Sequence, residues 1–462
     1  MVLDGDNDNA IQVATELSED LNAEVVGVGT SNWSRLLRSR YCDVGVTTVP
    51  ASEPGYADQL LDAVEAHGPD LLVPVGYHSV AAVDGIRDDL PDSVECWLPP
   101  SESLDVAVDK VATAELAAEL DVGTPTSFTD RVAALDDHGR PGEVADLPFP
   151  LFLKARHECG KNVTAEIERP GAFWATYDDL VAEAGVQEVI VQECIPGDRT
   201  YACGLLYDEG APQLLFAHEE LRSVPREGGS GTRVRLFRDP RIETAAIRLL
   251  DSLDWHGPAL VEFKRCADGS YALMEINPKL WASYALASQS GYRFVSTCAR
   301  RALGIEGGRT GRPPDATAEM VFPLRELYYA ARTDDESVLR SIASICWPPA
   351  RLDLNLRDVG AWLTPPAAVV DTVENASVAT SVQNASVGGD RDDGTDGLTA
   401  GTEHANGDSP PGDAGQGDAD EGTADASTAD VSNADEGTAD ASLADVGNAD
   451  DEILDEADLP GD

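Results

Sequence analysis

The stretch ALVEFKRCADGSYALMEINPKL, residues 259–280, contains two apolar runs on either side of Asp268-Gly269. Asp-Gly between alternating apolar runs is the strongest short-range signal for a β-hairpin. A two-residue loop at Asp268-Gly269 would place Glu262 directly opposite Glu275, with their Cβ atoms about 5 Å apart. Asn277 follows two residues later, so it lies on the same face. The stretch therefore predicts a hairpin with two carboxylates and an amide on one face.

Two opposed carboxylates need a compensating charge. Like charges directly opposite each other destabilise a strand pair, and apolar surroundings increase the cost. A Mg²⁺ ion (or Mn²⁺) binds carboxylate and amide oxygens and keeps coordination sites for phosphate oxygens. We therefore predict a metal site formed by Glu262, Glu275 and Asn277. The alternative is a chance pairing in an acid-rich chain, in which acids such as Asp268 and Glu219 have no predicted role.

The chain is acidic along its whole length. Its 462 residues include 33 Lys+Arg and 84 Asp+Glu, for a formal net charge of −51. Nucleic acids and anionic membranes require a basic surface, so we expect neither as a partner. The composition is typical of cytosolic proteins of salt-accumulating halophiles. Lysine is nearly absent, and the five lysines are Lys110, Lys154, Lys161, Lys264 and Lys279.

The cysteine pattern and the hydropathy indicate a soluble cytoplasmic protein. The eight cysteines have no CxxC spacing and no partner histidines, so reduced thiols are expected rather than disulfides or a zinc site. No apolar run reaches membrane-spanning length, and no signal peptide precedes the first expected strand. The sequence leaves open whether the chain forms a homo-oligomer.

The first hundred residues have the pattern of an α/β domain. Apolar strands at 1–3, 23–29 and 71–75 alternate with helices, which predicts a small doubly wound parallel sheet. The strand 71–75 leads into residues 76–79 at the carboxyl edge, where such sheets bind ligands. We expect substrate contacts at residues 76–79.

The rest of the chain divides into three parts. Residues 101–310 begin with a helix at 104–120 and continue with paired strands, while residues 311–370 form a small extension of unassigned role. Residues 371–462 contain one basic residue, no aromatic residue and a recurring unit, ADEGTADASTADVSN (419–433) and ADEGTADASLADVGN (434–448). So little apolar surface cannot offset the entropy of ordering, so we predict a disordered acidic tail.

Three further segments are candidates for ligand contacts. Lys154 ends the apolar strand PFPLFLK (148–154), where an ammonium can reach phosphate oxygens, although a surface lysine has the same pattern. The strand VIVQECIPGD (189–198) ends in a Pro-Gly turn whose free backbone groups can bind an adenine edge; a plain connection is the alternative. The loop LRSVPREGGSGTRVR (221–235) suits a mobile cover that binds a carboxylate or phosphate, and a solvated loop is the alternative.

The order of these motifs resembles the ATP-grasp superfamily over roughly residues 1–310, in particular its predicted carboxylate–amine ligases and carbamoyl-phosphate-synthase-like members. The Glu-x-Asn-Pro block is the most specific match. The matching segments are Asp109-Lys110, FPLFLKARHECGKN (149–162), VIVQECIPGD (189–198), RSVPREGGSGT (222–232), WHGPALVEFKR (255–265) and LMEINPKLWAS (273–283). The resemblance implies an ATP-grasp fold, in which a small parallel-sheet domain (1–100) precedes two α+β subdomains (101–310).

The resemblance also implies roles for individual residues. The ATP phosphates would be contacted by Lys110 and Lys154, and the nucleoside would be held by Gln192, Glu193, Ile195 and Asp198. The metal ligands would again be Glu262, Glu275 and Asn277. The transferring group would be stabilised by Lys279, which replaces the family's arginine after Asn-Pro, and by Arg222 and Arg226.

The implied activity is that of an ATP- and Mg²⁺-dependent ligase. It would activate a small-molecule carboxylate as an acyl phosphate, which an amine then attacks. The alternative is an ATP-grasp-like nucleotide-binding module or sensor with reduced catalysis, which the replacement at Lys279 favours. An oxidoreductase of the Rossmann type is disfavoured, because no G-x-G-x-x-G follows the first strand.

Overall fold

The computed structural model describes residues 1–137, 139–140, 142–157, 163–184, 188–197, 199–224, 230–306, 318–332, 343, 345, 351–353, 355 and 357–363. Residues 1–393 form one compact unit, and residues 394–462, the second unit, lie outside these ranges. The disordered tail and the four-part division of the chain therefore stay predictions. No helix within the described ranges is long and apolar enough to cross a membrane.

The N-terminal residues form a parallel sheet, as predicted. Val2 bridges strands on both sides, which gives the order β2 (Val44–Thr47), β1 (Val26–Gly29), Val2, β3 (Leu71–Leu72) and β4 (Glu95–Cys96). The connecting helices are α1 (Asp8–Leu21), η1 (Leu36–Arg38), α2 (Tyr56–His67), α3 (Tyr77–Gly85) and η2 (Arg87–Asp89). Helices α1 and α2 pack in different clusters on the two faces of this sheet, so the doubly wound prediction is confirmed.

The single helix expected over residues 104–120 is in fact two helices, α4 (Ser101–Val108) and α5 (Lys110–Glu119). Asp109 separates them and caps the second, because its Oδ1 accepts a hydrogen bond from the Val111 N–H at 2.9 Å. Aspartate favours such N-cap positions over helix interiors, since its short side chain competes for backbone donors.

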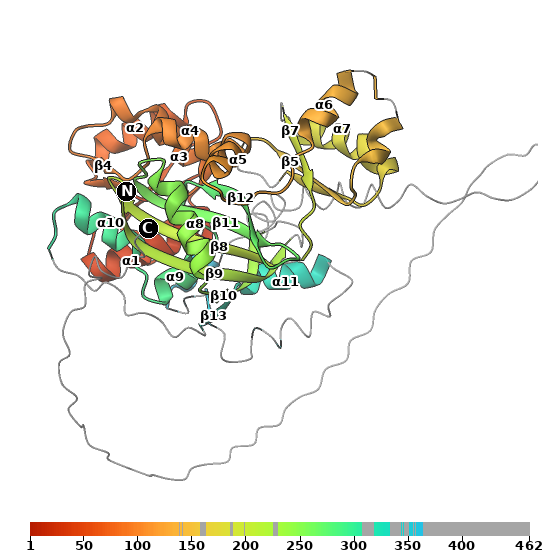
Figure 1. The fold of residues 1–462 in the computed structure, drawn as a ribbon. Helices are drawn as coiled ribbons and strands as arrows, with labels where there is room; N and C mark the ends of the chain where they lie inside the picture. The colour runs from red at the N-terminus through yellow and green to blue at the C-terminus, as the bar shows by residue number, and fades with distance from the viewer. Residues whose placement is uncertain are drawn as a thin grey trace, which may run out of the picture. The chain divides into compact units, whose positions relative to one another are not determined.

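A three-stranded antiparallel sheet follows in the chain. Its order is β6 (Thr164–Ile167), β5 (Leu151–Ala155) and β7 (Val189–Glu193). Its apolar residues pack with those of the flanking helices (Figure 1), which are α6 (Thr129–Asp137), η3 (Gly142–Asp146), η4 (Pro170–Ala172) and α7 (Phe173–Ala184). The sequence predicted β5 and β7 but not β6 or α7.

The largest sheet has the strand order β12-β11-β8-β9-β10-β13-β14, and only the last pair is parallel. These strands are β8 (Thr200–Asp208), β9 (Ala211–Val224), β10 (Ser230–Leu236), β11 (Gly257–Arg265), β12 (Tyr271–Asn277), β13 (Glu319–Val321) and β14 (Arg351–Leu352). The accompanying helices are α8 (Pro240–Asp251), α9 (Tyr284–Gln289), α10 (Phe294–Ala302), α11 (Pro323–Arg332) and α13 (Val359–Trp362). Strands β8, β11 and β12 follow the sequence prediction closely, whereas β9 extends beyond the predicted strand into the segment expected to be a loop.

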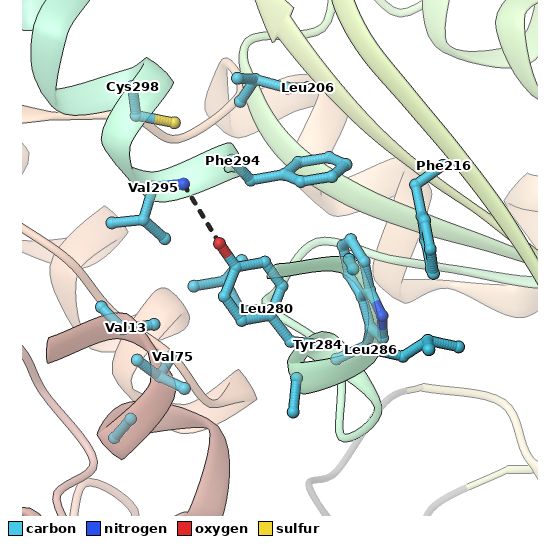
Figure 2. Packing of buried hydrophobic residues seen from close by; sticks show 14 of the residues in the cluster. Val13, Val75, Leu206, Phe216, Leu280, Tyr284, Leu286, Phe294, Val295 and Cys298 are labelled. Atoms are coloured by element: carbon cyan, nitrogen blue, oxygen red, sulfur yellow. Dashed lines mark hydrogen bonds between the residues drawn. The ribbon is translucent and has the colours of Figure 1, made fainter. Parts of the chain in front are cut away.

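The two faces of this sheet have separate cores. On one face, α8 contributes Ile242, Ala246 and Leu249 to a cluster with residues of β8, β11 and β12. On the other face, α9 and α10 pack against the sheet and against α1 of the N-terminal domain. Figure 2 shows this second cluster, in which Val13 and Val75 lie near Tyr284 and Phe294. A shared apolar core therefore joins the N-terminal domain to the large sheet.

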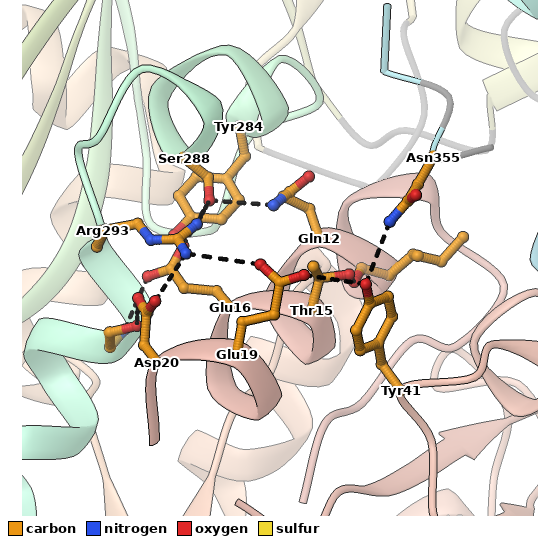
Figure 3. Close-up of polar contacts among 12 residues, drawn as sticks. Gln12, Thr15, Glu16, Glu19, Asp20, Tyr41, Tyr284, Ser288, Arg293 and Asn355 are labelled. Atoms are coloured by element: carbon orange, nitrogen blue, oxygen red, sulfur yellow. Dashed lines mark hydrogen bonds and ion pairs between the residues drawn. The ribbon is translucent and has the colours of Figure 1, made fainter. Parts of the chain in front are cut away.

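A buried polar network runs through the same contact (Figure 3). Glu16 of α1 is fully buried and accepts hydrogen bonds from Tyr284 Oη (2.7 Å), Ser288 Oγ (2.7 Å) and the Ser296 N–H (2.8 Å). Burial raises the pKa of Glu16, while these three donors act in the opposite direction. The acceptor lies on α1, and the three donors lie on α9 and α10. These hydrogen bonds therefore fix how α1 lies on α9 and α10.

We expect Glu16→Ala to lower the free energy of unfolding by about 2–4 kcal/mol, since it leaves three buried donors without their acceptor. Urea denaturation followed by circular dichroism measures this change. The matched control is Glu19→Ala on the same helix, where the side chain is 51% exposed and the expected change is below about 0.5 kcal/mol. Equal midpoints for the two variants would contradict the role assigned to Glu16.

Candidate active site

The hairpin of β11 and β12 has the predicted register at the end that carries the two carboxylates. Glu262 lies opposite Glu275, and Leu260 lies opposite Asn277. The turn itself differs from the prediction, because the Cys266 N–H bonds to the Ser270 carbonyl at 2.9 Å across three residues instead of two. A register shift after Glu262 restores the predicted pairing. The prediction was right because two errors, in the turn and in strand regularity, cancel.

The register shift is a β-bulge that adds Met274 to β12, between Leu273 and Glu275. Leu273 and Ile276 both belong to the core cluster beneath α8, although they are three residues apart. In a regular strand, residues three apart face opposite sides. The bulge therefore moves Glu275 and Asn277 onto the face that carries Glu262, as bulges near functional sites commonly do.

Asn277 joins the two carboxylates. Its Nδ2 donates to Glu262 Oε2 at 2.9 Å and to Glu275 Oε1 at 3.0 Å. Withdrawal from solvent, and then the Glu275 charge, raise the pKa of Glu262 well above its usual value. Withdrawal also acts to raise the pKa of Glu275, but the Lys110 charge and the neighbouring hydrogen bonds hold it well below the usual range. One carboxylate thus tends to hold a proton while the other stays ionised.

Two lysines, one from a helix and one from a strand, reach this pair. Lys110, at the start of α5, lies with its Nζ 3.5 Å from Glu275 Oε2. Lys154, at the end of β5, is buried and donates to the Met274 carbonyl at 2.9 Å, the carbonyl of the bulged residue. Burial lowers the pKa of Lys154 to about 8, and the Glu275 charge acts against this shift. Lys279, two residues after Asn277, acts on Glu262 with its positive charge.

The donor set suits a hard divalent cation. Glu262 and Glu275 offer carboxylate oxygens, and both side chains retain some exposure. Asn277 would have to present its carbonyl oxygen instead of the amide nitrogen that now faces the carboxylates. Among the described residues there is no group of three or more His, Cys, Asp and Glu that could hold a metal. The site predicted from the sequence consists of two acids and one amide.

The predicted nucleoside segment is only partly as expected. Gln192 is buried, and its Oε1 has no hydrogen-bond partner within the described ranges. The prediction of free backbone donors is wrong at Glu193, whose N–H donates to the Thr126 carbonyl at 2.9 Å, because residues 126–128 run along β7. Ile195 is buried after the strand, and Asp198 lies outside the described residues.

The predicted cover loop is mostly strand. β9 extends to Val224 and β10 begins at Ser230, so only residues 225–229, including Arg226, lie outside the described ranges. Arg222 forms an ion pair with Glu326, which is fully buried. The loop prediction is therefore wrong for its described ends, where Arg222, Arg233 and Arg235 pair with acids on neighbouring elements.

The segment 76–79, expected to contact substrate, is held by the N-terminal loop. Asp4 Oδ2 accepts hydrogen bonds from the Val75 N–H (3.0 Å), the Gly76 N–H (2.7 Å) and the Ser79 hydroxyl. An internal carboxylate thus occupies the donors at the start of α3 that could otherwise bind a phosphate.

Sequence reasoning included Asp109 in the Asp109-Lys110 match but missed its pairing with Arg156. Asp109 precedes Lys110 and binds Arg156, which follows Lys154 by two residues. The available signal was an aspartate directly before a lysine in a helical pattern, which marks an N-cap. Nothing in the sequence indicated Arg156 as its partner.

Comparison with known proteins agrees with the fold. No family model matches the chain. The chain is 22% identical over 219 residues to the carbamoyl phosphate synthase large chain of Thermoplasma acidophilum, which covers 44% of this chain and 20% of that protein. It therefore spans about a fifth of the length of the curated relatives it matches.

Solved structures with the same fold cover more of the chain. A biotin carboxylase from Campylobacter jejuni, in a β-γ-ATP complex, matches with a TM-score of 0.55 and 14% identity over 69% of this chain and 73% of that one. The biotin carboxylase domain of a Hydrogenobacter thermophilus 2-oxoglutarate carboxylase, with MgADP, ADP and bicarbonate, matches with a TM-score of 0.55 and 15% identity over 69% and 72%. The chain therefore has the ATP-grasp fold, as the resemblance predicted.

Proposed function

We propose that the protein is an ATP- and Mg²⁺-dependent ligase that activates a carboxylate as an acyl phosphate for attack by an amine. The observation that carries the proposal is the convergence of Glu262, Glu275 and Asn277 with the ammonium groups of Lys110 and Lys154. Phosphoryl transfer needs mainly positioning and neutralisation of charge, and these groups can supply both. ATP and MgADP in the structural neighbours support the choice of nucleotide and cation.

The chemistry assigns a task to each group. Glu262, Glu275 and Asn277 would hold Mg²⁺, which neutralises phosphate charge when bound. Lys110 and Lys154 would contact the phosphates, and the nucleoside would lie along Gln192, Glu193, Ile195 and Asp198. The substrate carboxylate would accept the terminal phosphoryl group of ATP with release of ADP. An amine would then displace phosphate from the acyl phosphate to form an amide.

The substrate end of the site would use the remaining cations. Lys279 would stabilise the acyl-phosphate oxygens, together with Arg222 and Arg226. An ammonium keeps the charge of the family's arginine but lacks its bidentate fork. That replacement favours a second candidate function, a nucleotide-binding module or sensor with reduced turnover.

We expect Glu275→Gln to abolish ADP release while leaving the circular dichroism spectrum unchanged. The glutamine keeps the shape of the side chain but removes the charge that faces Lys110 and the cation. The assay follows ADP in high KCl with Mg²⁺, ATP and a panel of carboxylates combined with amines. Asp268→Asn, in the exposed turn of the same hairpin, is the matched control and should behave as wild type.

The panel separates the two candidates. Wild-type ADP release that depends on a carboxylate supports the ligase. ATP binding without ADP release for any pair favours the binding module, and wild-type turnover by Glu275→Gln would refute the site.

We expect Glu262→Gln to raise the free energy of unfolding at neutral pH, in the absence of divalent cations, by up to about 1 kcal/mol. The substitution removes a carboxyl whose pKa burial and the Glu275 charge raise in the folded state, and such a group favours the unfolded chain. The same variant should lose most of the stabilisation that Mg²⁺ gives to the wild type. Urea titrations with EDTA and with Mg²⁺ measure both effects, and Asp268→Asn again serves as the control. A full Mg²⁺ effect in Glu262→Gln would exclude this residue as a ligand.

A further inference from the structure

Arg156 lies where three segments meet. It is the first residue after β5, and its backbone N–H donates to the Glu188 carbonyl at 3.0 Å, just before β7. Its own carbonyl accepts from the Lys110 N–H at 3.1 Å, at the start of α5. The neighbouring His157 forms an isolated antiparallel bridge with Asp109. The main chain of Arg156 therefore connects the three-stranded sheet to α5.

The side chain of Arg156 makes a second connection to the same helix. Its Nε lies 2.9 Å from Asp109 Oδ1, and its Nη2 lies 2.7 Å from Asp109 Oδ2, so the guanidinium binds the carboxylate in a fork. The Arg156 hydrogen bonds, opposed by partial burial, lower the pKa of Asp109 to about 2. Bidentate pairs of this kind fix orientation as well as distance. The remaining Nη1 binds Glu188, which is mostly exposed.

This double connection joins the two parts of the fold that carry Lys110 and Lys154, the lysines proposed to contact the phosphates. Ala117 of α5 packs in the same core cluster as Leu273 of β12, so α5 and Lys110 belong with the large sheet. Leu153 of β5 packs in the core of the three-stranded sheet, so Lys154 belongs with that sheet. Asp109 precedes Lys110 by one residue and Arg156 follows Lys154 by two, so their ion pair joins the backbone beside one lysine to the backbone beside the other.

We propose that Arg156 is a positioning residue for the nucleotide polyphosphate: its fork on Asp109 fixes Lys110 relative to Lys154. This inference rests on the proposed function, because it assigns the polyphosphate to the two lysines. Arg156 need not touch the nucleotide. The link acts on phosphate contacts, which require both lysines at once, and not on contacts with the nucleoside.

The test compares two ligands and four variants by isothermal titration calorimetry. The ligands are the Mg²⁺ complex of the β,γ-methylene analogue of ATP, and adenosine. Arg156→Gln removes the fork, and Asp109→Asn removes the carboxylate but keeps a good N-cap residue, which protects the start of α5. Arg156→Lys keeps the charge without the fork. Glu188→Gln is the matched control, because it removes the other acid bound to Arg156.

We expect Arg156→Gln and Asp109→Asn to weaken the analogue by about tenfold or more, as for loss of a charge-assisted pair. Their affinity for adenosine should stay within about twofold of wild type. The affinity of Arg156→Lys for the analogue should lie between that of the wild type and that of Arg156→Gln. Glu188→Gln should match the wild type in its affinity for both ligands. Hydrogen exchange of the Lys110 amide, measured without nucleotide, should accelerate in Arg156→Gln but not in Glu188→Gln.

Each contrary result has a distinct meaning. Parallel losses for the analogue and adenosine, or no loss for either, would overturn the positioning role while leaving the proposed function intact. A wild-type protein that binds neither ligand would refute the proposed function together with this inference.

Discussion

The β-bulge at Met274 is the constraint on which the site depends. A regular hairpin would turn Glu275 and Asn277 towards the core beneath α8, where an ionised carboxylate would be costly. The extra residue reverses the side chains beyond it and places both on the face of Glu262. It also leaves the Met274 carbonyl in position to accept from Lys154. One inserted residue therefore creates the carboxylate pair and anchors a cation beside it.

The segment that follows the carboxylates is held from several sides. Gly204 of β8 leaves room for the Trp281 ring, since a Cβ at this position would lie 2.3 Å from that ring. Asn9 of α1 donates to the Leu280 carbonyl at 2.9 Å. Ser283 bonds to His218 at 3.0 Å, and burial lowers the pKa of that histidine to about 3, so it stays neutral. The N-terminal domain and the large sheet together thus fix the segment that carries Lys279.

The sequence predicted the elements with strong local signals and missed those set by tertiary contacts. The bounds of β8 and β12 matched the structure to the residue, because each is a short apolar run bounded by turn residues, and every residue of β8 between its two ends is buried. The break at Asp109 could have been recognised from N-cap chemistry. The arginine-rich segment around Arg222 could not, since its strands are stabilised by acids far along the chain, such as Glu326. The pairing of Glu262 with Glu275 was correct only because the three-residue turn and the bulge offset each other.

The use of lysine at this site, in a chain whose basic residues are mostly arginine, has a physical explanation. Only five of the 33 basic residues are lysines, and two of these, Lys110 and Lys154, lie at Glu275. Lys154 is buried. Its ammonium group donates a hydrogen bond to the Met274 carbonyl, and the nearby carboxylates stabilise its charge. A guanidinium there would bring five donors in a fixed plane, most of which would lack acceptors. An ammonium can also turn its three protons from the Met274 carbonyl towards a ligand. Arginine suits Arg156 for the opposite reason, because there a rigid fork must hold one carboxylate in one orientation.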